Sequence, residues 1–215
     1  MKKITAMLLC LVLVLSLCAC GAKENLVGTW KANIELADLM NKEIAASGDA
    51  AMAEAMNLES FQLPLILELR EDGTCTMKVD PEAMAASTEK LATDLTEGLK
   101  AYFVTMLEQQ GLEVEDPTEV LTTMGLDLDA LVAEMKDQFL SEDTFAEFTM
   151  ESKYKAEDGK IYFSDDLESE INADEYNTYT LKGDTLTLDV GNMVIEEGQE
   201  DMAAYMFPMT LTRVK

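Results

Sequence analysis

The chain contains no histidine among its 215 residues. Its absence removes the Ser-His-Asp and Cys-His arrangements of nucleophilic catalysis and every histidine-ligated metal centre. Residues 87–90, Ser-Thr-Glu-Lys, have the Ser-x-x-Lys spacing of penicillin-recognising enzymes, but the Ser-Asp-Asn and Lys-Thr-Gly companions of that motif are missing. Carboxylates are too numerous for any pair to stand out as a general acid and base. We therefore expect a protein that is not an enzyme and that has no cofactor.

An acidic run, SDDLESEINADE, occupies residues 164–175 and suggests a weak cation site. It lacks the alternating ligand positions and the central glycine of an EF-hand loop. The favoured interpretation is a solvated acidic loop, and no metal site is predicted. The carboxylates concerned are Asp165, Asp166, Glu168, Glu170, Asp174 and Glu175.

The first 20 residues carry a different kind of chemistry. Two lysines, an apolar stretch over residues 6–17 and small residues before a cut site are typical of a secretory signal. The apolar stretch is shorter than the roughly 20 residues that a membrane-spanning helix needs. The sequence Leu17-Cys18-Ala19-Cys20 also resembles the bacterial lipobox, in which the last cysteine receives lipid and becomes the mature N-terminus.

This resemblance implies that residues 1–19 are a cleaved lipoprotein signal peptide, that Cys20 is acylated, and that residues 20–26 are a short tether. The expected location is the extracytoplasmic face of a bacterial cell membrane, with the membrane as a partner through the lipid anchor. The alternative is a conventional signal peptide with a cysteine-rich flank.

Cys75 is the only cysteine that would remain besides the acylated one. No intramolecular disulfide could then form, so the domain would depend on its hydrophobic core. A lone cysteine in a strand is usually a small buried apolar residue, with a reactive thiol as the alternative.

The net charge of −26 comes from 42 acidic and 16 basic residues. Such a surface repels nucleic acid, so no nucleic-acid partner is expected. Hydrophobic residues make up 48% of the chain, which is typical of a folded domain. We expect one domain over residues 27–215.

Alternating apolar and polar residues predict about eight strands in hairpin order. Hairpin turns are expected at Asp72-Gly73, Asp158-Gly159 and Gly183-Asp184. The alternation assigns the following residues to inward faces: Gly28, Trp30, Ala32 and Ile34; Leu63, Leu65, Leu67 and Leu69; Cys75, Met77 and Val79; Phe148, Met150 and Tyr154; Ile161 and Phe163; Leu186, Leu188 and Val190; Phe207, Met209, Leu211 and Arg213.

Two longer regions follow the helical period instead. Apolar residues recur at helical spacing over residues 81–110 and again over 117–140. They predict a helical insert at about residues 81–140, between strands three and four. A shorter helical segment, 36–56, is expected between strands one and two, broken near residues 47–49. The predicted fold class is β-rich α+β.

One set of motifs resembles bacterial lipocalin-like lipoproteins. It comprises Leu26-Val27-Gly28-Thr29-Trp30, the hairpin sequences at residues 71–74 and 181–186, and Leu211-Thr212-Arg213-Val214. In that family the Gly-X-Trp lies at the closed end of an eight-stranded antiparallel β-barrel, and an arginine of the last strand packs across the indole. The resemblance therefore implies such a barrel, with Gly28, Trp30 and Arg213 as a structural barrel-end motif.

An eight-stranded barrel is wide enough either to be filled by its own side chains or to hold one small ligand. The inward rows are apolar, so the first hypothesis is a binding module for a small hydrophobic molecule, with unknown ligand-binding residues. The alternative is an interaction or envelope structural lipoprotein with a packed, ligand-free barrel. In that case a protein partner would bind the helical insert through Met84, Met106, Met124 and Met135. The first hypothesis predicts an apolar void inside the barrel, and the second an exposed apolar patch on the helices.

Overall fold

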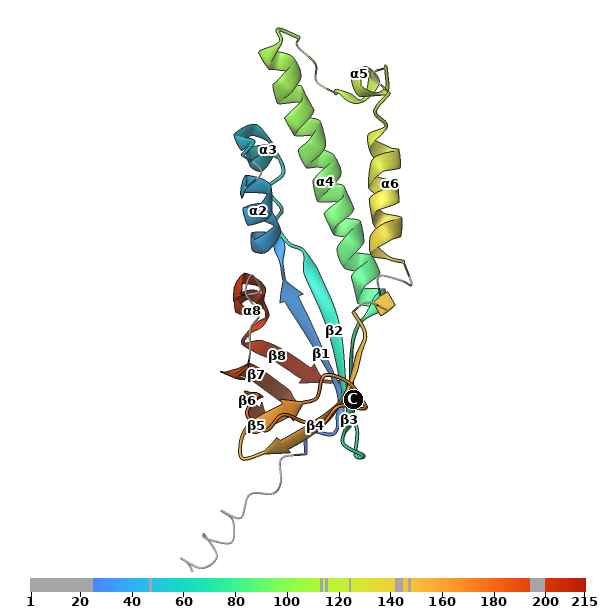
Figure 1. The fold of residues 1–215 in the computed structure, drawn as a ribbon. Coiled ribbons are helices and arrows are strands. Elements are labelled where there is room, and N and C mark those ends of the chain that lie inside the picture. The colour runs from blue at the N-terminus through green and yellow to red at the C-terminus, as the bar shows by residue number, and fades with distance from the viewer. Residues whose placement is uncertain are drawn as a thin grey trace, which may run out of the picture.

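The computed structural model describes residues 25–46, 48–112, 114, 116–123, 125–141, 145–146, 148–193 and 200–215. Eight antiparallel strands pair in sequence order, and the last strand returns to the first to close a barrel (Figure 1). The prediction of a closed eight-stranded antiparallel barrel is confirmed. The strands are β1 (Gly28–Glu35), β2 (Gln62–Leu69), β3 (Thr74–Val79), β4 (Met150–Glu157), β5 (Lys160–Phe163), β6 (Tyr176–Lys182), β7 (Thr185–Asn192) and β8 (Met209–Arg213).

Tight turns fix the register of three hairpins. Gly73 lies in the turn between β2 and β3 with a φ of 82°. Asp158 and Gly159 join β4 to β5 with φ values of 52° and 74°, as a two-residue turn between twisted strands requires. Gly183 has a φ of 61° between β6 and β7. The three turns predicted from sequence are therefore confirmed.

The interior is filled most tightly at one end of the barrel. Trp30, Ile161, Leu186 and Leu211 have no exposed surface there, and Leu69 is 2% exposed. Complete burial of a side chain of this size stabilises the fold by about 1.5–3 kcal/mol relative to leaving it in water. We call this filled end the closed end.

Three residues assigned to the inward rows remain accessible to solvent. Met150 is 52% exposed, and Phe148 and Val190 are also among the exposed large hydrophobic residues. Phe148 precedes the first residue of β4, and Val190 lies where the β6–β7 register shifts. The alternation gave the correct strands, but these positions lie at strand ends where few neighbours remain to cover them.

The helices extend the molecule away from the barrel (Figure 1). They are α2 (Ala37–Ala46), α3 (Ala50–Ala55), α4 (Pro81–Gln109), α5 (Thr118–Thr123), α6 (Leu128–Phe139) and α8 (Glu200–Met206). The 29 residues of α4 span about 44 Å at 1.5 Å per residue. Helix α4 packs between α3 and α6, and the core continues out of the barrel through Phe61, Met84, Leu91 and Leu95.

Two helical predictions differ from the structure. Residues 117–140 form two helices, α5 and α6, because Gly125 has a φ of 84° and Asp127 accepts a hydrogen bond from the Ala130 amide at 3.0 Å. Helix α8, between β7 and β8, was not expected from the sequence. It lies against β1, where the β1–β8 pairing has ended.

Asp80 joins the barrel to the long helix. Its carboxylate caps α4 by accepting the Ala83 amide at 3.3 Å, and it accepts a hydrogen bond from the Lys31 ammonium of β1 at 2.5 Å. Asp80 is buried, whereas the Lys31 side chain is 52% exposed. The Lys31 hydrogen bond, aided by the helix cap, lowers the pKa of the Asp80 carboxyl below its ordinary value.

We expect Asp80→Ala to lower the free energy of unfolding by about 1–2 kcal/mol, because the helix loses its cap and Lys31 its partner. Since the folded pKa of Asp80 is depressed, its contribution is complete above the unfolded pKa of about 3.9 and is lost as the pH falls through the folded pKa. Urea denaturation at pH 7 and pH 3 measures this.

The matched control is Asp94→Ala, which removes an exposed-face ion pair to Lys90 within the same helix. It should cost less than about 0.5 kcal/mol. Equal costs for the two variants would show that Asp80 does not fasten the helix to the barrel.

Candidate functional site

The structure brings the barrel-end residues of the sequence motif together. The Arg213 guanidinium lies over the Trp30 ring, with its carbon 4.1 Å from the ring centroid. It also donates to the Val27 carbonyl at 2.6 Å and to the Asn25 carbonyl at 2.7 Å. The Trp30 indole N–H donates to the Leu26 carbonyl at 2.8 Å. The arrangement holds the segment before β1 against the closed end, so it is a structural seal.

The backbone conformation of Gly28 and its lack of a side chain suit this seal. Its φ of 143° is one that side-chain-bearing residues rarely adopt. A Cβ built on Gly28 would lie 2.7 Å from Arg213 Nη1. The glycine therefore lets the guanidinium approach the backbone closely.

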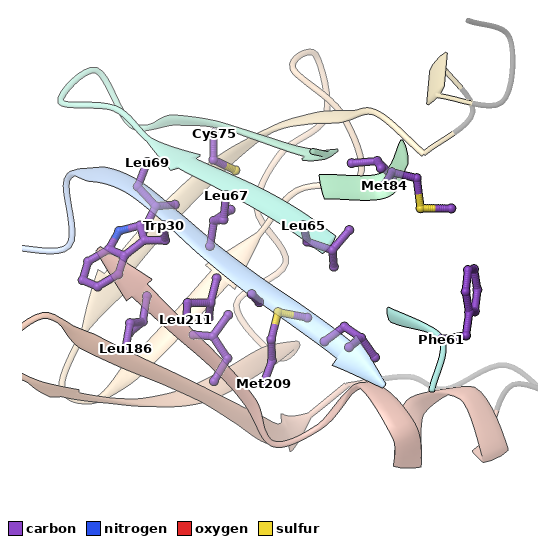
Figure 2. Close-up of a cluster of buried hydrophobic side chains, with 14 of the residues drawn as sticks. Trp30, Phe61, Leu65, Leu67, Leu69, Cys75, Met84, Leu186, Met209 and Leu211 are labelled. Atoms are coloured by element: carbon purple, nitrogen blue, oxygen red, sulfur yellow. The ribbon is translucent and has the colours of Figure 1, made fainter. Parts of the chain in front are cut away.

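A cavity of about 400 Å³ opens beyond the closed end, between the barrel wall and α8. Figure 2 shows the order along the barrel, with Trp30 and Leu186 on the closed side, then Leu211 and Leu67, then Met209 toward α8. The cavity volume falls within the roughly 300–1,000 Å³ that is usual for small-molecule sites. Its apolar walls include Leu67, Phe163, Leu188, Ala203 and Phe207.

Six methionines dominate this cavity, which we call the methionine-lined cavity: Met77, Met150, Met193, Met202, Met206 and Met209. Unbranched thioether side chains adapt their shape to irregular contents. Met202 and Met206 come from α8, one helical turn apart, so α8 forms part of the wall. Strand alternation had placed Met77, Met150 and Met209 inward, but the three other methionines were missed. For two of them a sequence signal existed: Met202 and Met206 are four residues apart, at helical spacing, just before β8.

Four polar groups also line the methionine-lined cavity: Cys75, Ser152, Ser164 and Asn177. The Cys75 sulfur lies 3.1 Å from the Ser152 hydroxyl, and burial raises the pKa of the thiol, which keeps it neutral. Ser164 donates to the Asp166 carbonyl at 2.5 Å and accepts the Lys153 amide at 2.9 Å. Asn177 donates to the Asp189 carbonyl at 3.2 Å and to the Met193 sulfur at 2.8 Å.

The methionines predicted to line a groove on the helical insert lie elsewhere. Met84 is buried in the core, Met135 is packed against the core, and Met106 is half-buried on α4. Met124 lies outside the described residues. A second, open cavity of about 320 Å³ does lie between α4 and α6, but none of the three described methionines lines it. An ion pair between Lys136 and Glu89 bridges those helices.

The remaining candidate residues hold local roles. Ser87 exchanges hydrogen bonds with the Gln62 backbone at 2.7 and 3.0 Å, whereas Lys90 pairs with Asp94 at 2.8 Å. Ser87 and Lys90 therefore have separate partners. In the acidic run, Asp166 accepts the amides of Glu168 and Ser169, which shapes its own loop.

The described part of the chain has neither a cluster of metal-ligating side chains nor a membrane-spanning helix. Among those residues, no group of three or more Asp, Glu or Cys side chains is arranged to hold a metal ion. In the same residues, no helix is both long and apolar enough to cross a membrane. Cys20 and the predicted signal peptide lie outside the described residues, as does most of the tether.

Comparison with protein families, with characterised proteins and with solved structures gave no match to this chain.

Proposed function

We propose that this chain is a lipid-anchored, extracytoplasmic, lipocalin-like binding module, without enzymatic activity, that holds a small hydrophobic molecule in the methionine-lined cavity. The observation that carries the proposal is the cavity itself: an apolar space of about 400 Å³ inside a barrel whose other end is filled. An apolar void of this kind is what distinguishes a binding barrel from a packed one.

The lipocalin-like part of the proposal is supported by the barrel-end motif. The glycine, the tryptophan and the last-strand arginine that resemble that family in sequence meet at the closed end. This supports a barrel that is sealed at one end and binds at the other.

The proposed anchor would orient the cavity. Arg213 holds Asn25 at the closed end, so only five peptide steps separate an acylated Cys20 from the barrel. Those steps reach at most about 18 Å at 3.5 Å per residue. The closed end would then face the membrane, and the methionine-lined cavity would open away from it.

Co-purified small molecules test the binding proposal. The mature protein is isolated under conditions in which detergent does not extract its ligand. Denaturation in organic solvent is then expected to release an apolar compound, which mass spectrometry detects. An uncharged environment-sensitive dye should also bind the emptied protein with one-to-one stoichiometry. If repeated preparations release no compound and the emptied protein does not bind the dye, the packed, interacting barrel is the better account.

Two neighbouring alanines of α8 provide a matched pair for this test. Ala203 lines the methionine-lined cavity, whereas Ala204 is exposed and is not among the lining residues. Ala203→Phe should fill part of the cavity and weaken dye binding at least tenfold. Ala204→Phe should leave dye binding unchanged, and an equal loss in both variants would contradict the assignment of the site.

The anchor is tested separately with Cys20→Ser. We expect this variant to lose acylation and to be unprocessed or released from the membrane fraction, while the purified domain still binds the dye. Normal processing with unchanged membrane retention would refute lipidation at Cys20.

A further inference from the structure

The part of the cavity wall that the structure describes carries no charged side chain. Among the described residues that line the methionine-lined cavity, none is Lys, Arg, Asp or Glu. The Cys75 thiol is neutral, and the serine and asparagine side chains are already hydrogen-bonded within the protein. A charged group that entered the cavity would lose water and would meet no opposite charge on the described lining residues in exchange.

Two lysines adjacent in sequence to lining residues have partners elsewhere. Lys78, next to Met77, pairs with Glu68 at 2.9 Å. Lys153, next to Ser152, donates to the carbonyls of Glu168 and Ser169 at 3.4 and 3.0 Å. Neither lysine is placed to neutralise a carboxylate or phosphate held in the cavity.

The net charge of the whole chain further disfavours the binding of anionic ligands. With a net charge of −26, the field around the molecule opposes the approach of a fatty acid or an anionic lipid. The segment that links two lining residues, Ser164 and Asn177, is itself the acidic run.

We infer that the methionine-lined cavity selects uncharged hydrophobic molecules and rejects amphiphiles that carry a charged head group, fatty acids above all. This inference rests on the proposed function and specifies its ligand class. The flexible thioether side chains can adapt to ligands of several shapes, so the cavity selects by the charge of the ligand rather than by its shape.

Three probes of equal chain length test the inference: 1-dodecanol, dodecanoate and dodecylammonium. Each would displace the uncharged dye from the full mature protein at pH 8 and low salt, at concentrations below micelle formation. We expect dodecanol to bind at least tenfold more tightly than dodecanoate and also more tightly than dodecylammonium. Equal or tighter binding of either charged probe overturns the inference while leaving the binding function intact. Failure of the dye itself to bind removes the proposed function instead.

A substitution at the cavity wall gives a second, independent readout. Met202 is 42% exposed on α8, so a polar replacement there is compatible with folding. Met202→Lys should shift the preference at least tenfold toward dodecanoate, because it supplies the missing cation. Met202→Gln is the uncharged control and should keep the preference for dodecanol. An unchanged dodecanoate affinity in Met202→Lys would show that the absence of a cation does not set the selectivity.

Discussion

Replacing Trp30 with alanine is expected to lower the free energy of unfolding by about 3–5 kcal/mol. The indole has no exposed surface at the closed end, so its removal leaves a cavity among Leu69, Leu186 and Leu211. The Leu26 carbonyl also loses its indole donor, and Arg213 loses the ring beneath it. Trp30 is the only tryptophan, so the variant has no tryptophan fluorescence to report unfolding. Urea denaturation followed by far-ultraviolet circular dichroism measures the change instead.

Phe148→Ala is the control for this prediction. Phe148 is also a large aromatic residue, but it is 49% exposed before β4. Its replacement should change the free energy of unfolding by less than about 0.5–1 kcal/mol. A Trp30→Ala variant as stable as Phe148→Ala would show that the closed end does not hold the barrel together.

Gly28→Ala is expected to destabilise the fold by about 1–3 kcal/mol, although the change adds only a methyl group. Two causes act together: the φ of 143° is strained for alanine, and the new Cβ would lie 2.7 Å from Arg213 Nη1. Thermal and urea denaturation both report the loss.

Gly183→Ala separates the two causes. Gly183 also has a positive φ, of 61°, but nothing lies within 4 Å of a Cβ built there. It should therefore cost less than Gly28→Ala. Combining Gly28→Ala with Arg213→Ala should give less than the sum of the single costs, because the contact is removed. Full additivity would show that backbone strain alone explains the effect of Gly28→Ala.

Local signals were enough to predict the strands and their hairpin order, whereas the barrel was what the resemblance to lipocalin-like lipoproteins implied. A period of two with glycine-containing turns predicts hairpins, because each turn fixes the pairing of the strands beside it. This is why the strands on either side of Gly73, Gly159 and Gly183 could be assigned from sequence.

The methionine-lined cavity could not be predicted in the same way. Its walls come from the strands and from α8, a helix of seven residues that is too short to give a clear helical period. Alternation also says which side of a strand faces inward, but not how far the neighbouring strands cover it. Met150 and Val190 are therefore on the expected strands and nevertheless exposed.

The division of residues 117–140 depends on backbone detail of the same local kind. Apolar spacing continues across Gly125, so the period alone favours one helix. The positive φ of Gly125 and the new hydrogen bond at Asp127 restart the helix in the structure.

The β1–β8 seam has a consequence for the order of folding. It joins segments at opposite ends of the domain, as the bond from Arg213 to the Val27 carbonyl shows across 186 residues. Contacts between such distant segments form late, because a large loop must close before they stabilise anything. Until β8 arrives, β1 and β7 are both open edges able to pair with another chain. In a nascent chain β8 is synthesised after the other seven strands, so its five residues end the period in which the barrel is prone to aggregate.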